Sequence, residues 1–300
     1  MPKMSIRTRS RGLTRVKKDG DDLIFTIYPM EPGEQDVVTI YNRDFDRIEN
    51  CEYFNDSLID LKIKDIISTL PKDKKEKVHA FSSLFYAWIK DYKSTKEAHD
   101  RVAKWTKRID IFELDFIFFP IIYNLHCSLV VICRPLHWAL FQNEFSHDHM
   151  QNSVGCFLHF DSCNQSVHQT KEIYHVITNF LSHEWNSKKK KSNQDNDKNN
   201  IIRLPIIRPL CPKQKNGYDC GPFVIKYVEK FLALFPGTSI NDINSKIKDS
   251  LKANMFTQSE VTQFRDDYRI QLNEFSIQYA NLIKEQNSEE ESRALKIIKK

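Results

Sequence analysis

The chain has 300 residues, of which 40% are apolar, enough to build a folded core and too many for a disordered protein. Its apolar runs are short, whereas a membrane-spanning helix needs about twenty apolar residues, so we expect no membrane span. Residues 1–18 contribute +7 and residues 187–200 contribute +3 to the net charge of +5, which leaves −5 for the remainder. This distribution argues against a nucleic-acid-binding fold, whose basic patch should lie on structured elements.

The first eighteen residues are basic and look disordered, and they suit either a nuclear address or a solvated end. No apolar signal-peptide core is present in the N-terminal stretch. The seven cysteines are odd in number and unevenly spaced, which argues against a disulfide framework. We therefore expect reduced thiols in the cytosol or the nucleus.

The first half of the chain predicts short strands, then helices, then two longer strands. The predicted strands cover residues 22–28, 36–41, 110–123 and 128–133, and the predicted helices cover residues 55–70 and 79–92. Asn55, Asp56 and Ser57 are favourable helix N-cap residues ahead of apolar positions at helical spacing. Ser128 to Cys133 is rich in β-branched residues and is the expected central strand.

The second half predicts two strands and three helical stretches. We expect strands over 156–161 and 201–208, helices over 170–185 and 221–234, and a polar, helical C-terminal stretch of about sixty residues. The Lys- and Asn-rich residues 188–200 cannot bury apolar surface and predict a surface insertion. Helices and strands that occur in separate blocks predict an α+β fold.

The stretch Gln214 to Phe223, QKNGYDCGPF, carries the strongest chemical signal. Asn216 and Gly217 form a turn pair, and Gly221–Pro222 opens an apolar helix, so Cys220 would sit at a helix N-terminus. The helix dipole stabilises a thiolate there, and the Cys220 N–H could donate to an oxyanion. Gln214 offers a side-chain amide as a second donor. The alternative is a buried cysteine that acts as a small apolar residue.

A thiolate nucleophile needs a histidine base and a group that orients this base. His126 begins one predicted strand and Asp161 ends another, so both side chains would lie at one end of the sheet if the two strands are neighbours. The triad order would then be His, Asp, Cys. His137, followed by Trp138, is the alternative base.

A zinc site is a rival interpretation of part of this region. Cys156, His159, Cys163 and His168 have the spacing of a small zinc knuckle. The apolar residues between them are instead typical of a buried strand, and no glycine turn separates the first pair. We predict no metal here.

Several motifs together resemble the Ulp/SENP family of cysteine proteases, which process SUMO and related modifiers. The similar segments are QKNGYDCGPFV around Cys220, NLHCSLVVI around His126, LHFDS around Asp161, YFNDSLIDLKIKDII from Tyr53, and RVAKWTKRIDIFELDFIFFP from Arg101. The similarity extends from about Leu23 to beyond Leu234, and the chain looks closest to the branch that edits poly-SUMO chains.

The resemblance implies a papain-like core with a permuted triad order, namely a central mixed sheet flanked by helices. Cys220 would be the nucleophile, His126 the general base and acid, Asp161 the residue that orients His126, and Gln214 a donor of the oxyanion hole. The implied reaction is cleavage after the C-terminal Gly-Gly of SUMO, on an isopeptide bond or a precursor tail. The expected partners are SUMO or a relative and its conjugates. No cofactor, specific nucleic acid or membrane is expected, and the protein would be a monomer.

The sequence departs from the family pattern at the expected substrate channel. The substrate-binding residues implied by the resemblance are Tyr53, Phe54, Asn55, Asp56, Cys127, Asp219 and Gly221. In the family a tryptophan follows the catalytic histidine, and here Cys127 stands in its place while Tyr53 occupies the second aromatic position. A missing indole removes a contact surface of about 150–250 Å², so substrate threading could be weaker.

The domain boundaries follow from the same reasoning. We expect a basic tail over residues 1–20, a catalytic domain over 21–285 and a charged tail over 286–300. Residues 134–153 and 187–200 would be surface insertions in the catalytic domain. Three functions remain as alternatives: a protease for another ubiquitin-like modifier, a degenerate protease that binds SUMO without cleaving it, and a nucleic-acid or scaffold protein.

Overall fold

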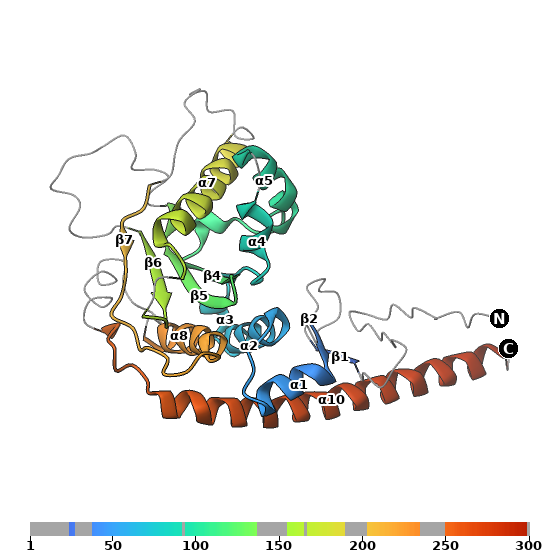
Figure 1. Cartoon of the computed structure of the whole chain (residues 1–300). Helices are drawn as coiled ribbons and strands as arrows, with labels where there is room; N and C mark the ends of the chain where they lie inside the picture. The colour runs from blue at the N-terminus through green and yellow to red at the C-terminus, as the bar shows by residue number, and fades with distance from the viewer. Residues whose placement is uncertain are drawn as a thin grey trace.

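The computed structural model describes residues 24–27, 38–91, 94–136, 155–164, 167–189, 203–234 and 250–298 (Figure 1). A five-stranded mixed sheet forms its centre, in the order β3, β4, β5, β6, β7. Its strands are β3 (Val78–Ala80), β4 (Phe116–Tyr123), β5 (His126–Cys133), β6 (Cys156–Asp161) and β7 (Ile206–Ile207). β5 is the middle strand, as its β-branched sequence predicts, and all eight of its residues are buried.

The central sheet mixes two kinds of strand pairing. β5 is antiparallel to both β4 and β6, whereas the edge strands β3 and β7 are parallel to their neighbours. β1 (Ile24–Ile27) and β2 (Val38–Tyr41) form a separate antiparallel pair. The predicted α+β class with a central mixed sheet is confirmed.

Helices cover both faces of the central sheet (Figure 1). α4 (Phe85–Lys90), α5 (Thr95–Val102) and α7 (Thr170–Lys189) cover one face, and α2 (Asp56–Ser68) and α8 (Cys220–Leu234) cover the other. α10 (Gln258–Ile298) runs along the outer side of α2 and α8, close to α1 (Asn42–Glu49). The short α3 covers Lys72–Lys75, and 3₁₀ turns cover Ala103–Trp105 and Ile111–Glu113.

Alternating strand residues feed two hydrophobic cores, one on each sheet face. Phe118, Leu129 and Phe160 belong to the core under α2 and α8, whereas Phe119 and Val130 belong to the core under α4, α5 and α7. This alternation is the two-residue period of a strand that is buried on both sides. The sheet is thereby held between two helical layers.

Three predicted elements are partly wrong. The helix predicted over 79–92 begins as strand β3, which pairs with β4, and α4 starts only at Phe85. The strand predicted over 110–123 starts at Phe116, because the Asp110 side chain accepts the Phe112 N–H and forms a 3₁₀ turn. The strand predicted over 201–208 is reduced to two residues beside Pro205, whose nitrogen has no hydrogen to donate to a ladder.

The remaining predicted strands and helices agree with the structure within a few residues where it describes them. The predictions missed α1 and α5, although Ser94 and Glu97 carry a capping pattern at the start of α5. The expected N-terminal tail and most of the two expected insertions lie outside the described residues. No helix in the described part of the chain is long and apolar enough to cross a membrane.

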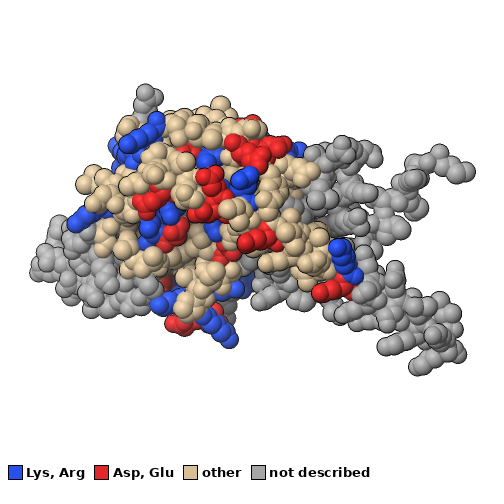
Figure 2. Space-filling model, turned by 90° about the horizontal axis from the view of Figure 1, so that it is seen from below, with Lys and Arg blue, Asp and Glu red and all other residues tan. Residues whose placement is uncertain are grey.

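The face that carries α10 has mixed charge. Figure 2 shows acidic and basic side chains interspersed over this face rather than gathered by sign. An extended basic stripe of the kind that binds nucleic-acid backbones is not visible on it.

Candidate active site

His126 and Asp161 meet where two inner strands of the central sheet have their ends. β5 begins at His126, and its antiparallel neighbour β6 ends at Asp161, which lies opposite Ser128. His126 Nε2 lies 2.7 Å from Asp161 Oδ1, and both side chains are buried. The Cys163 N–H also donates to Asp161 Oδ1 at 2.9 Å. The strand register therefore produces the predicted contact between the two residues.

Cys220 is the first residue of α8, at the end of a tight turn. Asn216 Oδ1 accepts the N–H groups of Tyr218 at 3.2 Å and Asp219 at 3.0 Å, which holds the turn ahead of the helix. The Cys220 side chain forms a hydrogen bond with His126. Because His126 Nε2 binds Asp161, Nδ1 is the ring nitrogen left for Cys220. The structure therefore brings together the three residues predicted as a triad.

The electrostatics of this cluster favour a charged pair. A hydrogen bond from the Cys127 thiol is the largest influence on the Cys220 thiol, and together with His126 it outweighs burial and lowers the pKa of Cys220 to about 5. Burial would lower the pKa of His126, but hydrogen bonds with Asp161 and Cys220 overcome this effect and raise it to about 9. Between these values Cys220 is a thiolate and His126 an imidazolium.

Asp161 stays ionised beside this pair. Burial acts to raise the pKa of Asp161, but hydrogen bonds from His126 and the Cys163 N–H overcome it and hold the pKa below its usual range. An ionised Asp161 fixes the orientation of the His126 ring and stabilises its positive charge. Asp161 thus has the geometry of an orienting residue.

Gln214 lies beside the cluster with its side-chain amide held at both ends. Ser162 Oγ donates to Gln214 Oε1 at 2.6 Å, and Gln214 Nε2 donates to the Asn216 carbonyl at 2.7 Å. The Gln214 backbone N–H binds the Ser162 carbonyl at 3.0 Å. These bonds fix which end of the amide carries the N–H donors, as an oxyanion donor requires.

A cleft of about 490 Å³ opens beside His126, at this end of the central sheet. Its walls include His126, Gln214, the half-exposed Tyr53 and the largely exposed Leu125. Cys220 is only 1% exposed, and His126 connects it to the cleft because His126 lines the cleft and binds Cys220. Leu125 and the preceding Asn124 both have positive φ, at 57° and 50°, in the tight turn that leads into His126.

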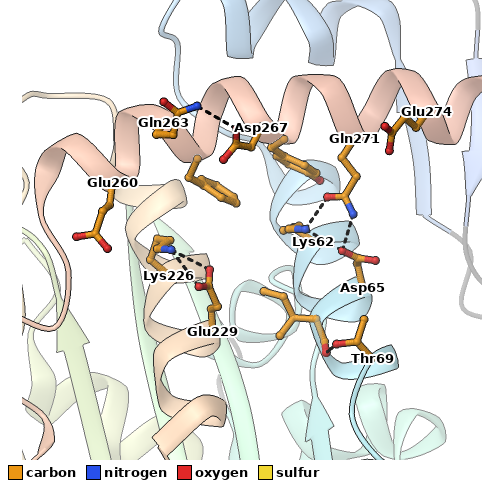
Figure 3. Close-up of a pocket in the computed structure, with 13 residues that line it drawn as sticks. Lys62, Asp65, Thr69, Lys226, Glu229, Glu260, Gln263, Asp267, Gln271 and Glu274 are labelled. Atoms are coloured by element: carbon orange, nitrogen blue, oxygen red, sulfur yellow. Dashed lines mark hydrogen bonds and ion pairs between the residues drawn. The ribbon is translucent and has the colours of Figure 1, made fainter.

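A larger groove of about 790 Å³ lies between α2, α8 and α10 (Figure 3). Its lysines are already paired: Lys62 with Asp65 at 2.8 Å and Lys226 with Glu229 at 3.0 Å. No cysteine or histidine is among the described residues that line it. The smaller cleft, rather than this groove, therefore adjoins the His126–Cys220 pair through His126.

The expected substrate-binding residues have varied surroundings. Tyr53 lines the cleft, while Cys127 is buried against Cys220. The hydrogen bond with Cys220, and after it burial, raises the pKa of Cys127. Asn55 caps α2 by accepting the Leu58 N–H at 3.1 Å. Asp56 is the first residue of α2 and is partly exposed. Their contacts with a substrate stay predictions.

Phe54 and Gly221 pack against each other where α2 meets the start of α8. A Cβ added at Gly221 would lie 2.8 Å from Phe54 Cβ and 3.2 Å from Ile59 Cδ1. Any larger residue would push the first turn of α8, which begins at Cys220, away from α2. Glycine at position 221 therefore allows the close packing of α8 against α2 that places Cys220.

Asp219 anchors the turn before Cys220 to α10. Arg265 Nε donates to Asp219 Oδ1 at 2.6 Å, and Gln258 Nε2 donates to Asp219 Oδ2 at 2.7 Å. Arg265 also donates to the Glu52 carbonyl at 2.8 Å and lies over the Phe54 ring. α10 therefore fastens the nucleophile turn to the segment that precedes α2.

Sequence reasoning missed the two α10 residues. A signal for them exists, because Val261, Phe264, Tyr268 and Leu272 repeat at helical spacing and are buried. Arg265 lies on this same stripe and is 4% exposed, which identifies it as a buried and therefore paired arginine.

The rival interpretations fare differently. Cys156 lies at the far end of β6 from Asp161, opposite Cys133, whereas His159 and His168 are hydrogen-bonded to Ser128. Within the described ranges no group of three His, Cys, Asp or Glu side chains could hold a metal, so the zinc-knuckle pattern does not form a site. His137, the alternative base, lies outside the described residues.

Comparison with known proteins identifies the family. The chain belongs to the Ulp1 protease family, whose C-terminal catalytic domain matches residues 52–278. Probable ubiquitin-like-specific protease 2A of Arabidopsis thaliana is 31% identical over 259 residues, which is 83% of this chain and 31% of that protein. Sentrin-specific protease 7 of Mus musculus is 26% identical over 273 residues, which is 72% of this chain and 26% of that protein.

The solved structures agree with this assignment. The crystal structure of a de-sumoylating protease superposes with a TM-score of 0.59 at 25% identity, covering 84% of this chain and 92% of that chain. The chain spans less than a third of the length of the curated relatives described above. The resemblance to the Ulp/SENP family is thereby confirmed, whereas the poly-SUMO branch stays a prediction.

Proposed function

We propose that this chain is a cysteine protease that cleaves after the C-terminal Gly-Gly of SUMO or a related modifier. The single observation that carries the proposal is the continuous contact from Asp161 through His126 to Cys220 beside the cleft. Family membership supports it, as do the relatives described as ubiquitin-like-specific, sentrin-specific and de-sumoylating proteases.

The first step of the mechanism forms a thioester. The Cys220 thiolate attacks the carbonyl carbon of the terminal glycine, and the carbonyl oxygen becomes an oxyanion. The Cys220 N–H and Gln214 Nε2 donate to this oxygen. His126, charged before the attack, gives its proton to the leaving lysine amine as the C–N bond breaks.

The second step releases the modifier. Neutral His126 accepts a proton from water, and the oxygen of this water attacks the thioester carbonyl. The C–S bond breaks, Cys220 leaves as a thiolate, and the modifier departs with a free carboxylate. Asp161 stays ionised throughout and keeps the His126 ring in place, so the pair of charges is restored for the next cycle.

The position next to His126 bears on substrate binding. Cys127 is buried against Cys220, and its thiol donates to the nucleophile. We therefore assign Cys127 to tuning the nucleophile, in place of the channel wall that the family's tryptophan provides. Tyr53 and Leu125, which are exposed at the cleft, are the apolar groups that would contact the modifier tail.

A panel of electrophilic probes built on SUMO, a Nedd-type modifier and ubiquitin tests this function. We expect a covalent adduct with the SUMO probe that is lost in Cys220→Ala and strongly reduced in His126→Ala. His137→Ala and the buried-cysteine variant Cys133→Ala serve as controls and should keep the adduct. An adduct with another modifier alone would replace SUMO as the substrate, and no adduct with any probe would contradict the proposal.

The cellular setting is a separate part of the proposal. The basic first eighteen residues support nuclear residence. A fluorescently tagged chain should enter the nucleus and lose this location when residues 1–18 are removed. A chain that stays outside the nucleus in both forms would contradict this part.

A further inference from the structure

A chain of hydrogen bonds runs from Thr170, at the start of α7, to the ring of His168, which lies beside His126. Thr170 Oγ1 lies 2.8 Å from His159 Nδ1, and His159 Nε2 lies 3.0 Å from Ser128 Oγ. Ser128 Oγ lies 2.7 Å from His168 Nδ1, and His168 Nε2 lies 2.9 Å from the Tyr123 carbonyl. Both ring nitrogens of His159 and both ring nitrogens of His168 therefore have hydrogen-bond partners.

The His168 ring ends this line against the proposed general base. The ring centroids of His126 and His168 are 4.8 Å apart, and the rings meet edge to face at 61°. His168 is 3% exposed, His159 2% and Ser128 0%. Water therefore cannot replace these buried hydrogen bonds unless this end of the sheet opens. The His168 ring is thus held rigidly beside His126.

The chemistry of the partners sets the direction of the bonds. The Tyr123 carbonyl can only accept, so His168 Nε2 carries a hydrogen, and neutral His168 has a bare Nδ1. The Ser128 hydroxyl then donates to His168, and the same oxygen accepts from His159 Nε2. His159 Nδ1 is left to accept from Thr170. A charged His168 would reverse all three of these bonds, because both of its nitrogens would donate.

Burial favours the neutral form of His168, and with it the bond directions that a neutral His168 requires. It is the largest cause that lowers the pKa of His168, and it lowers the pKa of His159 to about 4. The ionisable groups that act on His168 are His126 from β5, Asp161 and His159 from β6, Lys90 from α4 and Tyr123 from β4. Asp161 favours a charged ring, whereas His126 and Lys90 oppose it.

We propose that the chain Thr170–His159–Ser128–His168 makes His168 a positioning residue, which packs as a neutral ring edge against His126 while His126 carries the catalytic proton. A neutral neighbour supports the imidazolium without repelling it, and a rigid one limits rotation of the ring toward or away from Cys220. The inference rests on the proposed function for its catalytic consequence, while the direction of the bonds holds independently of it.

The direction of the bonds is measured first, by NMR on protein labelled with ¹⁵N at histidine. We expect His159 and His168 to be neutral with hydrogen on Nε2 from about pH 7 to 9, above the usual range of a histidine pKa. A His159 ring with hydrogen on Nδ1, or a His168 ring that titrates in this range, would overturn the proposal. This measurement needs no substrate, so failure of the proposed protease function leaves its result intact.

The catalytic consequence is measured with Ser128→Ala, which removes the donor to His168. We expect kcat to fall about 10- to 100-fold with KM changed less than about threefold. His168 should also gain a proton in mildly acidic solution, which adds an ionisation to the acid side of the kcat profile. His99→Gln is the matched control, since His99 is a buried histidine outside this line.

Two outcomes would contradict the positioning role. One is a Ser128→Ala profile with the wild-type shape and kcat; the other is an equal change in His99→Gln. If Ser128→Ala does not fold, Thr170→Val removes the donor at the other end with little change in volume. Because the Tyr123 carbonyl sets the direction of the bonds, the account then predicts that His159 keeps its hydrogen on Nε2 and that kcat falls less than in Ser128→Ala. A His159 ring with its hydrogen on Nδ1 in Thr170→Val would overturn it.

Discussion

Two buried histidine–carboxylate pairs in this protein have the same geometry. His126 Nε2 lies 2.7 Å from Asp161 Oδ1, and His99 Nε2 lies 2.7 Å from Glu184 Oε2. His126 joins two strand ends beside a cleft, whereas His99 joins α5 to α7 near the Phe180 ring. The proposed function depends on what the other side of the ring faces, which for His126 is Cys220.

The comparison shows that a histidine–carboxylate pair becomes a candidate catalytic site only through its third partner. Cys220 is placed there by a helix start, a tight turn and the Gly221–Phe54 contact, none of which the His99 pair has. Glu184 instead also pairs with Lys188 at 3.3 Å, within α7. The His99 pair therefore provides matched controls for substitutions at His126 and Asp161.

The largest expected effect is that of Cys220→Ala. It removes the nucleophile, so turnover of a SUMO conjugate should fall by at least about 1,000-fold while modifier binding is retained. Cys133→Ala alters another fully buried cysteine and should keep turnover near the wild-type rate. Gel-based cleavage and a binding assay measure the two quantities, and residual turnover in Cys220→Ala would refute the assignment.

His126→Ala is expected to have the next largest effect. Loss of the base and of the ion pair should lower kcat by about 1,000-fold, whereas His99→Ala should change kcat less than about threefold. His99→Ala should still lower the free energy of unfolding by about 1–3 kcal/mol, because it removes the buried His99–Glu184 hydrogen bond. Equal losses of kcat in the two variants would show that His126 acts only through stability.

Asp161→Asn should have a smaller effect than His126→Ala. The amide keeps the shape but cannot balance the imidazolium charge, so kcat should fall, but by less than the loss of about 1,000-fold expected in His126→Ala. Glu184→Gln makes the same chemical change in the His99 pair and should leave kcat unchanged. A loss in Asp161→Asn that matches or exceeds the loss in His126→Ala would assign Asp161 a different role.

The smallest expected effect is a shift in the pH profile of kcat/KM in Cys127→Ala, which should be visible at the edges of the profile and not near neutral pH. The thiolate forms as pH rises through the Cys220 pKa of about 5, and His126 loses its charge as pH rises through about 9, so kcat/KM should be bell-shaped between these values. Cys127→Ala removes the largest influence that lowers the Cys220 pKa and should move only the acid side upward. An unmoved acid side would contradict the Cys127 contact.

The sequence predicts the site better than it predicts the surrounding fold. His126, Asp161 and Cys220 each sit at the end of an element with a strong local signal, so their meeting required only that β5 and β6 be neighbours. β3 and β7 were harder to predict, because short edge strands depend on pairing with β4 and β6 rather than on their own residues.

The helical spacing in α10 could have indicated that Arg265 is buried, but not which residues it contacts. Arg265 binds Asp219 across 46 positions in the chain and Glu52 across 213, and no local spacing indicates such contacts. The same holds for His168, whose role emerges only when Ser128 is seen between two rings. Long-range polar partners of buried groups are the part of a site that a single sequence conceals.

The central claim is that Cys220 and His126 form a charged pair, and the alkylation rate of each cysteine against pH tests it most directly. Peptide mapping after brief iodoacetamide treatment should show Cys220 reacting with a midpoint near pH 5, and His126→Ala should move this midpoint to a higher pH, while His99→Ala should not. A wild-type midpoint near 8.5, the value of a free cysteine, would contradict the account.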